Sequence, residues 1–287
     1  MTEPISVLKE KCRIRGWEEQ KHPLYQKYFI RKISIYITKL FLYTSITANQ
    51  VTVFHILITL LGAVLLFFGT LEYMLIGILL MNFGFILDTV DGEIARYRKQ
   101  TSILGVHIDE ISHQFLPKFM YFGIAFSVFL NTAKISALIF GFLAVVFSAS
   151  VVFMALTWTI VNKRLEAIKS MEDSKEGINI RQNTKKENKL SKIGEATGKF
   201  GFLYKISEKM NFLWVCPYDK LIILLLIILE YINKSVMLVP RWSFLYWFLV
   251  VYGSFFTLNQ LASFIIHAKS NTAQKYYERL FGRDHNV

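Results

Sequence analysis

The chain has 287 residues and a net charge of +12, and 53% of its residues are hydrophobic. Long apolar runs in such a composition are typical of a polytopic membrane protein and exclude an ordinary soluble domain. Two cysteines, Cys12 and Cys216, are too few for a disulfide framework. Residues 1–23 are polar and lack an apolar core segment, so no cleavable signal peptide is expected.

The first structured segment is predicted at residues 24–46. It mixes aromatic residues with four cations, Lys27, Arg31, Lys32 and Lys39. Cations spread through the run argue against spanning a bilayer, and an amphipathic helix lying among the lipid headgroups fits better. A first transmembrane helix is the alternative. Residues 1–46 are therefore expected to form a cytoplasmic N-terminus with an interfacial helix.

Six apolar segments follow, each near the ~20 residues that cross a bilayer. They lie at about residues 50–70, 72–98, 105–130, 133–162, 217–233 and 242–266. The sequence thus predicts an all-α fold, with six transmembrane helices within residues 47–268. The interruption at 163–216 is polar and charged, as expected of a solvated cytoplasmic loop. Residues 269–287 are expected to be a cytoplasmic tail.

The basic residues predict the orientation of these helices. Six spans put both ends of the chain on one side, and that side receives 29 of the 33 Lys and Arg residues. The other side has three, Lys134, Lys234 and Arg241, and the remaining one, Lys118, lies inside the third span. By the positive-inside rule the termini are expected in the cytoplasm. The basic excess is then a topology signal and an attraction to anionic lipid, so no nucleic-acid partner is expected.

Three carboxylates and an imidazole lie in the second and third spans. Asp88 and Asp91 are three residues apart, and Asp109 and His113 are four apart, so each pair shares a helix face. Charges inside a membrane are costly and usually functional. Counting ~1.5 Å per residue from the helix ends, an antiparallel pair would place Asp88 opposite His113 and Asp91 opposite Asp109. An oxygen-rich ring of this kind is typical of sites for hard divalent cations.

The charges around this ring indicate a diphosphate substrate. Two divalent ions would neutralise a diphosphate and orient it for in-line attack. The planar guanidinium of Arg96, at the end of the same helix, can pair with a phosphate. Gly92 and Ala95 lack bulk, so a substrate could lie against the backbone there. A diphosphate is therefore expected to enter from the cytoplasm, beside lipid.

The spacing of these residues resembles a known signature. From Asp88 to His113 the chain reads D-x2-D-G-x2-A-R-x8-G-x3-D-x3-H. This resembles the motif of the CDP-alcohol phosphotransferase family, D-x2-D-G-x2-A-R-x8-G-x3-D-x3-D. Every fixed position matches except the last, where His113 replaces the fourth aspartate.

The resemblance implies a function and a set of site residues. Members of the family move a substituted phosphate group from a CDP-alcohol, such as CDP-diacylglycerol, to an acceptor hydroxyl and release CMP, most often in phospholipid synthesis. They are six-helix membrane homodimers with two divalent ions, here expected to be Mg²⁺ or Mn²⁺. The residues that the motif implies are metal ligands Asp88, Asp91, Asp109 and His113, nucleotide neighbours Gly92 and Ala95, and donor-placing residues Arg96 and Gly105.

His113 is the position where this inference is open. In the family the last aspartate is both a ligand and the base that deprotonates the acceptor, so Asp109 and His113 are the catalytic candidates. A histidine can act as a base, since its ordinary pKa of ~6.5 is near operating pH. It can also bind a metal, with a shift in preference from Mg²⁺ toward Mn²⁺ or Zn²⁺. The alternative is a fourth position lost together with activity.

Two other functions remain open. An intramembrane prenyltransferase also uses paired aspartates to hold a Mg²⁺-diphosphate, although Gly92, Ala95 and Arg96 favour the phosphotransferase. A non-catalytic membrane protein or transporter with a relic site is the third hypothesis. Metalloprotease and phosphatase signatures are absent from the sequence.

Several neighbouring residues have two interpretations each. Asn49 and Thr52 resemble an Asn-x-x-Thr that often precedes the first span in this family, and a helix N-cap is the alternative. Glu93 adjoins the ring off its face, where a solvated or supporting role is expected. Arg98 could bind a substrate phosphate or serve only as a topology charge.

Overall fold

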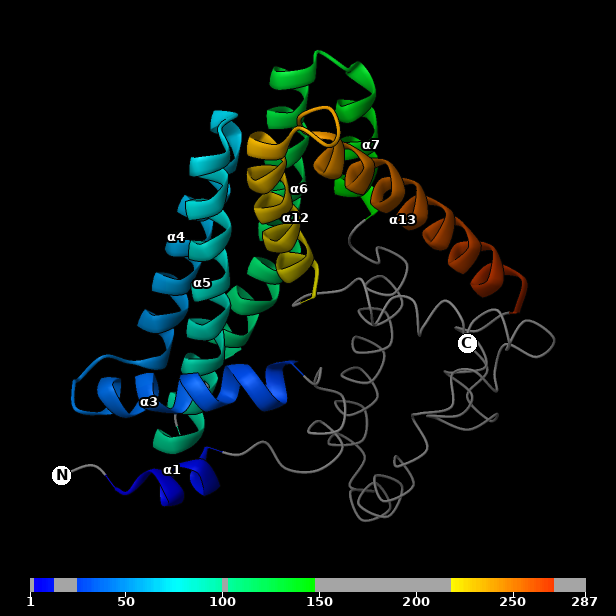
Figure 1. The fold of residues 1–287 in the computed structure, drawn as a ribbon. Coiled ribbons are helices and arrows are strands. Elements are labelled where there is room, and N and C mark those ends of the chain that lie inside the picture. Colours follow the sequence, from blue (N-terminus) through cyan, green and yellow to red (C-terminus); the bar gives the residue numbers. More distant parts are fainter. Residues whose placement is uncertain (1–2, 13–24, 100–102, 148–217, 271–287) are drawn as a thin grey trace. The chain divides into compact units, whose positions relative to one another are not determined.

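The structure is a computed structural model that describes residues 3–12, 25–99, 103–147 and 218–270. Within these ranges every element is a helix, which confirms the all-α prediction (Figure 1). The elements are α1 (Ile5–Lys11), η1 (Gln26–Ile30), α3 (Arg31–Leu42), α4 (Ala48–Leu65), η2 (Leu66–Phe68), α5 (Leu71–Arg98), α6 (Ile103–Thr132), α7 (Ile135–Phe147), α12 (Tyr218–Val236) and α13 (Ser243–Ser270). The predicted loop at 163–216 and tail from 271 lie outside the described residues.

The chain divides into two compact units. The first comprises Met1–Ser148 and Leu213–Ser254, and the second comprises Ala149–Phe212 and Phe255–Val287. Of the second unit, only the C-terminal half of α13 belongs to the described residues. The predicted site lies wholly within the first unit.

Four described helices are long and apolar enough to cross a membrane, so this is an integral membrane protein. They are Ala48–Phe68, Leu71–Arg98, His107–Thr132 and Ser243–Ala262, and they correspond to the first, second, third and sixth predicted spans. The fourth span is described only over the apolar helix Ile135–Phe147. The fifth is the helix α12, which buries Asp219, Lys220 and Glu230 and is not among the four. The count of six spans remains a prediction.

The hairpin of α4 and α5 carries most of the predicted site. Thr47 precedes the first residue of α4, and its side chain and backbone exchange hydrogen bonds with Gln50 in a capping box. Thr47, and not Asn49, is therefore the N-cap. The hairpin turns at Gly69, whose φ of +72° is the left-handed conformation that glycine adopts without strain. Asn131 of α6 donates to the Gly69 carbonyl at 2.7 Å, which ties the third helix to this turn.

Small residues bring the backbones of α4 and α5 close together. A Cβ at Gly62 or at Gly77 would collide with the carbonyl oxygen of the other glycine. Further along the same contact between α4 and α5, a Cβ at Gly84 would collide with the side chain of Thr59. Membrane helices commonly associate through such small residues, because apolar burial gives little advantage in lipid. The close contact lets side chains of α4 and α5 meet one turn further on, where Asp88 lies.

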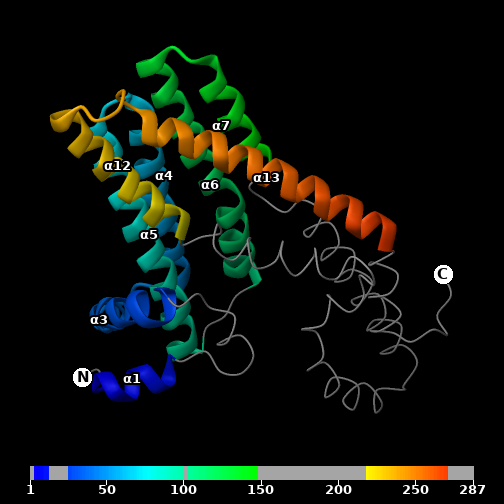
Figure 2. The ribbon, with the colours of Figure 1, turned by 45° about the vertical axis from the view of Figure 1, so that its right-hand side comes forward.

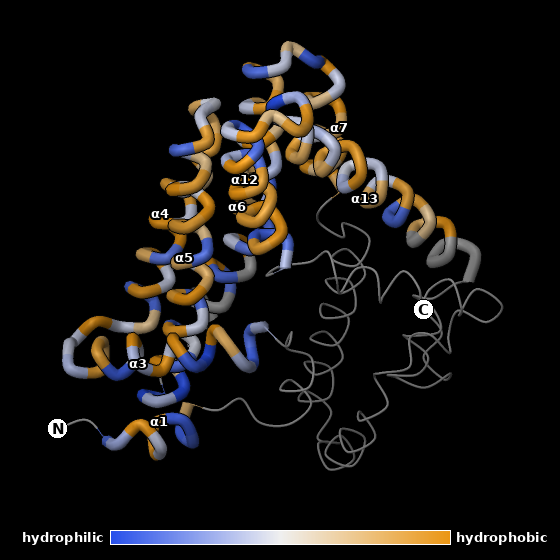
Figure 3. The backbone as a smooth tube through the Cα atoms, in the orientation of Figure 1, coloured by the Kyte–Doolittle hydropathy of each residue, from blue (hydrophilic) through white to orange (hydrophobic). Residues whose placement is uncertain are grey.

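α3 lies across the ends of α4 and α5 and does not run along them (Figures 1 and 2). Its buried polar side chains face α5, where Ser34 Oγ and Thr38 Oγ1 donate to the Glu93 carboxylate at 2.7 and 2.6 Å. Ile37 and Phe41 pack against the apolar cluster of α4 and α5 beside it. Figure 3 shows mixed hydrophilic and hydrophobic colours along α3, in contrast to the mainly hydrophobic α4. The interfacial position predicted for residues 24–46 is not tested by this geometry.

Buried polar contacts also join α6, α12 and α13. The Tyr121 hydroxyl donates to Asp219 Oδ2 at 2.8 Å and is hydrogen-bonded to the Tyr252 hydroxyl. At the other end of α12, the Glu230 carboxylate accepts from the backbone N–H groups of Trp242 and Phe244 at 2.9 and 2.7 Å. A carboxylate at that end of α13 complements the positive helix terminus. These contacts join α12 to α6 and to the start of α13.

Candidate functional site

Asp88 of α5 lies opposite His113 of α6, as the antiparallel pairing of the two helices predicts. The Nε2 atom of His113 lies 3.5 Å from Asp88 Oδ1 and 3.4 Å from Asp109 Oδ1. Asp88, Asp109 and His113 together form one group that could hold a metal ion. This group depends on a contact between residues in two different helices, which the helical spacing alone did not establish.

Asp91 is directed mainly toward α4. Its Oδ2 atom accepts a hydrogen bond from Thr52 Oγ1 at 2.6 Å and lies 3.6 Å from His55 Nδ1. Asp91 therefore joins a group with His55 and Asp88, whereas Asp109, the partner expected for it, joins Asp88 and His113. Residues three apart on a helix differ by ~60° in direction. Asp88 and Asp91 thus contact different neighbours, and only Asp88 belongs to both groups.

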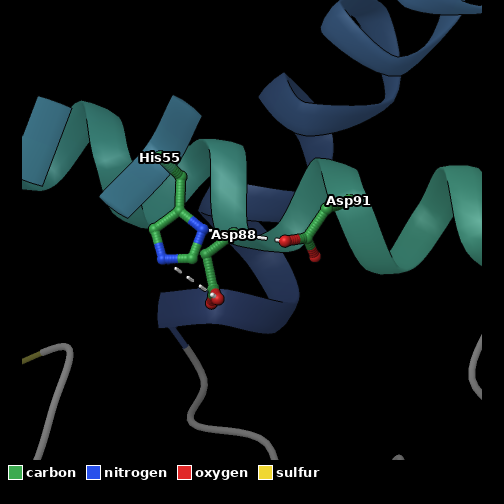
Figure 4. Close-up of side chains that lie close together, drawn as sticks. All are labelled: His55, Asp88 and Asp91. Carbon is green, nitrogen blue, oxygen red and sulfur yellow. Dashed lines mark ion pairs between the residues drawn. The ribbon is translucent and has the colours of Figure 1, made fainter. Parts of the chain in front are cut away.

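His55 is the residue that the sequence analysis missed. It lies in α4, three residues after Thr52, and its side chain is 3% exposed. Figure 4 shows its ring facing the carboxylates of both aspartates of α5. Its Nε2 lies 4.0 Å from Asp88 Oδ1. An ionisable residue within an apolar span was the available signal, the same one that singled out the aspartates.

The two groups share Asp88 and together form one cluster of five residues, His55, Asp88, Asp91, Asp109 and His113. This cluster is closed on the α4 side and open on the α6 side. The exposed fraction of the side chain rises from 3% at His55 through 11% at Asp91 and 13% at Asp88 to 39% at Asp109 and 43% at His113. A substrate would therefore meet Asp109 and His113 first. Asp88 and Asp91 lie deeper, so they would act on a substrate through a bound ion.

The residues of the cluster fit divalent cations. Among the described residues, His55 Nδ1 and Asp109 Oδ1 are buried atoms without a hydrogen-bond partner. The nitrogen–oxygen separations of 3.4 to 4.0 Å exceed the usual hydrogen-bond range. Two ligands at ~2.1 Å from one ion lie ~3.0 Å apart at a right angle and ~3.4 Å apart at the tetrahedral angle. Donor groups spaced in this way are closer to a ligand set than to a hydrogen-bond network.

Arg96 and Gly92 lie next to the cluster and contact each other. The Arg96 Nε donates to the carbonyl of Cys12 at 2.8 Å. Its guanidinium lies over Gly92, where an added Cβ would be 3.1 Å from one terminal nitrogen. The space at Gly92 thus admits the guanidinium. Burial raises the pKa of the Cys12 thiol to about 11, so this thiol is a poor nucleophile at neutral pH.

The remaining predicted residues are placed as follows. Ala95 is half-buried and packs against the apolar cluster that joins α4 and α5. Gly105 lies half-buried near the start of α6. Glu93 is buried against α3, so the solvated role considered for it is wrong. The Arg98 guanidinium donates to the carbonyls of Thr44 and Ile46, which fixes the turn before α4.

The comparison with known families bears on all of these residues. Residues 45–186 match the family model of CDP-alcohol phosphatidyltransferases. This region of the chain belongs to that family. The matched range includes every residue of the cluster, from His55 to His113, and also Thr52 beside it. No curated protein matches the chain.

CDP-alcohol phosphatidyltransferases are transferases that act on CDP-alcohols in lipid synthesis, and they generally depend on a divalent metal. The family thus accounts for a cluster within apolar helices that could hold a metal ion. It does not specify the donor, the acceptor or the role of a histidine at position 113.

Proposed function

We propose that this protein transfers a substituted phosphate group from a CDP-alcohol, such as CDP-diacylglycerol, to an acceptor hydroxyl and releases CMP. The observation that carries the proposal is the convergence of Asp88, Asp91, Asp109 and His113 on one partly open cluster within the matched family region. The product would be a phospholipid or a related phosphodiester.

The reaction is a displacement at phosphorus. The acceptor oxygen forms a bond to the phosphorus atom that carries the donor's alcohol group. The bond from that phosphorus to the bridging oxygen breaks, and the bridging oxygen leaves with CMP. The acceptor's proton passes to a base, so one hydroxyl and one diphosphate bond are consumed for one phosphodiester and one CMP.

The aspartates and His113 are proposed as the metal ligands. Bound divalent ions would neutralise the diphosphate and stabilise the charge on the leaving phosphate. The largely buried positions of Asp88 and Asp91 keep these carboxylates aimed into the cluster. The hydrogen bond from Thr52 to Asp91 further fixes one oxygen of that carboxylate. Ligands oriented by such partners generally hold a metal more tightly.

His113 and Asp109 are proposed to act on the acceptor. They have the most exposed side chains of the cluster, so an acceptor hydroxyl can approach them. The Nε2 of His113 faces both Asp88 and Asp109, an orientation that suits a metal ligand. The base role requires an imidazole within hydrogen-bond reach of the acceptor hydroxyl. Both roles require the imidazole itself, so loss of the ring should lower turnover in either case.

Arg96, Gly92, Ala95 and Gly105 are proposed to receive the nucleotide side of the donor. The Cys12 carbonyl holds the Nε of Arg96 and so fixes the guanidinium above Gly92, one residue after Asp91. The terminal nitrogens of a guanidinium can donate to a phosphate in a forked arrangement. Placement of the cluster at the cytoplasmic face and assembly as a homodimer are further parts of the proposal, and they rest on the charge distribution and on the family.

The test is an assay for CMP release. Purified protein is incubated with CDP-diacylglycerol or other CDP-alcohols, an acceptor panel, and Mg²⁺ or Mn²⁺. We expect CMP to appear only with a divalent metal and to be lost in the Asp88→Asn variant. Release of diphosphate from a prenyl donor, with no CMP from any CDP-alcohol, would instead support a prenyltransferase.

A further inference from the structure

His55 lies outside the family motif, yet it is the most buried member of the cluster. Its side chain is 3% exposed and belongs to α4, whereas every motif residue belongs to α5 or α6 or to the segment between them. Both ring nitrogens face carboxylates, with Nδ1 toward Asp91 and Nε2 toward Asp88 (Figure 4). A histidine that merely filled the apolar core would not need two acidic neighbours.

The contacts of His55 leave a ligand position open. Buried polar atoms in proteins are nearly always hydrogen-bonded. Within the described part of the chain, Nδ1 of His55 has no hydrogen-bond partner, and its nearest carboxylate oxygen, Asp91 Oδ2, is 3.6 Å away. That oxygen is already held by Thr52 at 2.6 Å. The arrangement therefore has an oriented oxygen, an unpartnered nitrogen and a separation of 3.6 Å, which lies between the ~3.4 Å of two ligands at the tetrahedral angle and the ~4.2 Å of two ligands on opposite sides of one ion.

Asp88 connects this position to the other half of the cluster. Its Oδ1 atom lies 4.0 Å from His55 Nε2 and 3.5 Å from His113 Nε2. A single carboxylate oxygen thus has an imidazole from α4 on one side and an imidazole from α6 on the other. Each of the two possible ligand groups contains one histidine, and both contain Asp88.

We propose that His55 is a metal ligand, so that the centre holds one cation among His55, Asp88 and Asp91 and a second among Asp88, Asp109 and His113. This inference deepens the proposed function and rests on it for the role of the metals in catalysis. Three carboxylates supply less negative charge than two dications carry, and neutral imidazoles add donors without adding charge. Imidazole nitrogen favours Mn²⁺ and later first-row ions over Mg²⁺. The centre should therefore select Mn²⁺ over Mg²⁺.

Binding of Mn²⁺ to the purified full-length protein, without any nucleotide, tests the proposal. Electron paramagnetic resonance of free Mn²⁺ gives the stoichiometry and affinity, and pulsed measurements of nitrogen coupling report imidazole ligands directly. We expect two ions per chain and coupling to two histidines. His55→Ala should weaken one of the two ions at least about tenfold, the effect usual for loss of a ligand or its support.

Three variants make the result specific. His113→Ala retains His55, so nitrogen coupling must persist in it; the double variant of His55 and His113 must lose all coupling. His107→Ala is the matched control, since His107 is an exposed histidine of α6 outside both ligand groups. If His55→Ala fails to fold, the coupling in His113→Ala decides the matter alone.

Two outcomes would overturn the proposal. One is nitrogen coupling that vanishes completely in His113→Ala. The other is a folded His55→Ala protein that binds two Mn²⁺ with unchanged affinity. Because no substrate is present, ligation by His55 can be established even if no CDP-alcohol yields CMP. Conversely, release of CMP without coupling from His55 would overturn this inference and leave the proposed function intact.

Discussion

At the scale of single residues, His113 decides whether the divergent motif is active. Its imidazole lies where a fourth aspartate would complete the cluster, 3.5 Å from Asp88 and 3.4 Å from Asp109. A base or ligand at this position contributes directly to the displacement. We therefore expect His113→Ala to lower the rate of CMP release by at least about 100-fold, the lower end of the contribution of a general base.

The controls for this prediction come from the same helix and from the motif. His107→Ala should leave the rate unchanged, since His107 is exposed and belongs to neither ligand group. His113→Asp restores the family residue and should keep activity, with a shift of preference toward Mg²⁺. Full activity in His113→Ala would show that the imidazole has neither role.

Residues were predictable from the sequence where their partners lie at fixed helical spacing. Asp88, Asp91, Asp109 and His113 stand at i,i+3 and i,i+4, and that regularity revealed a possible metal site. Partners from another helix were not predictable in this way. The ring of His55 meets an aspartate 33 residues away, and periodicity gives the face of a helix but not the neighbour it meets.

At the scale of elements, α3 is fixed to α5 by a buried carboxylate. Glu93 accepts hydrogen bonds from Ser34 and Thr38, and all three side chains are buried. Removal of both donors, in the Ser34→Ala and Thr38→Val double variant, leaves a buried charge without these partners. Since a hydrogen bond to a charged group contributes about 1.5–3 kcal/mol, we expect a clear loss of thermal stability in detergent. Amide hydrogen exchange should also become faster in α3.

A third substitution separates the hydrogen bonds from simple packing effects. Adding Glu93→Met to the double variant removes the charge and should recover much of the lost stability, because replacing both partners by apolar groups is nearly neutral. Tyr36→Phe is the surface control, as Tyr36 is 59% exposed on the same helix. A double variant as stable as the wild type would mean that Glu93 does not hold α3.

The close backbone contact between α4 and α5 gives a second prediction at this scale. A side chain at Gly77 would collide with the carbonyl of Gly62 and press on Leu65 and Leu66. Gly77→Val should therefore separate the two helices and lower the temperature of unfolding, and Mn²⁺ binding should weaken because the His55 and Asp88 side chains move apart. The control is Leu79→Val, a change at a side chain that is 49% exposed on α5. Equal effects of the two substitutions would contradict the close packing.

The helices themselves were predictable from apolar length, since each long apolar run had to satisfy its backbone internally. How they pack was not. The close contact of glycines on α4 and α5 depends on which faces of the two helices meet, and no local pattern reports that. The buried acids of α12 show the same limit, because Asp219 and Glu230 are satisfied by Tyr121 and by the start of α13.

At the scale of the whole molecule, the distribution of charge predicts on which side of the membrane each end of the helices lies. The end of α5 that carries Arg98 is bound to the turn before α4, and Arg96 binds the end of α1. The opposite end of α5 pairs with α12, where Lys234 lies 3.2 Å from Glu72. Since 29 of 33 basic residues are assigned to the first side, that side should be cytoplasmic.

Reporter fusions to the full chain test this orientation. A fluorescent protein after residue 287 should be fluorescent in the cytoplasm, whereas alkaline phosphatase inserted at Ala133, between α6 and α7, should be active outside it. The two reporters exchanged between the sites should both be silent. Phosphatase activity at the C-terminus would reverse the assignment and would place the acidic cluster, and with it the entry of a CDP-alcohol, on the side away from cytoplasmic nucleotides.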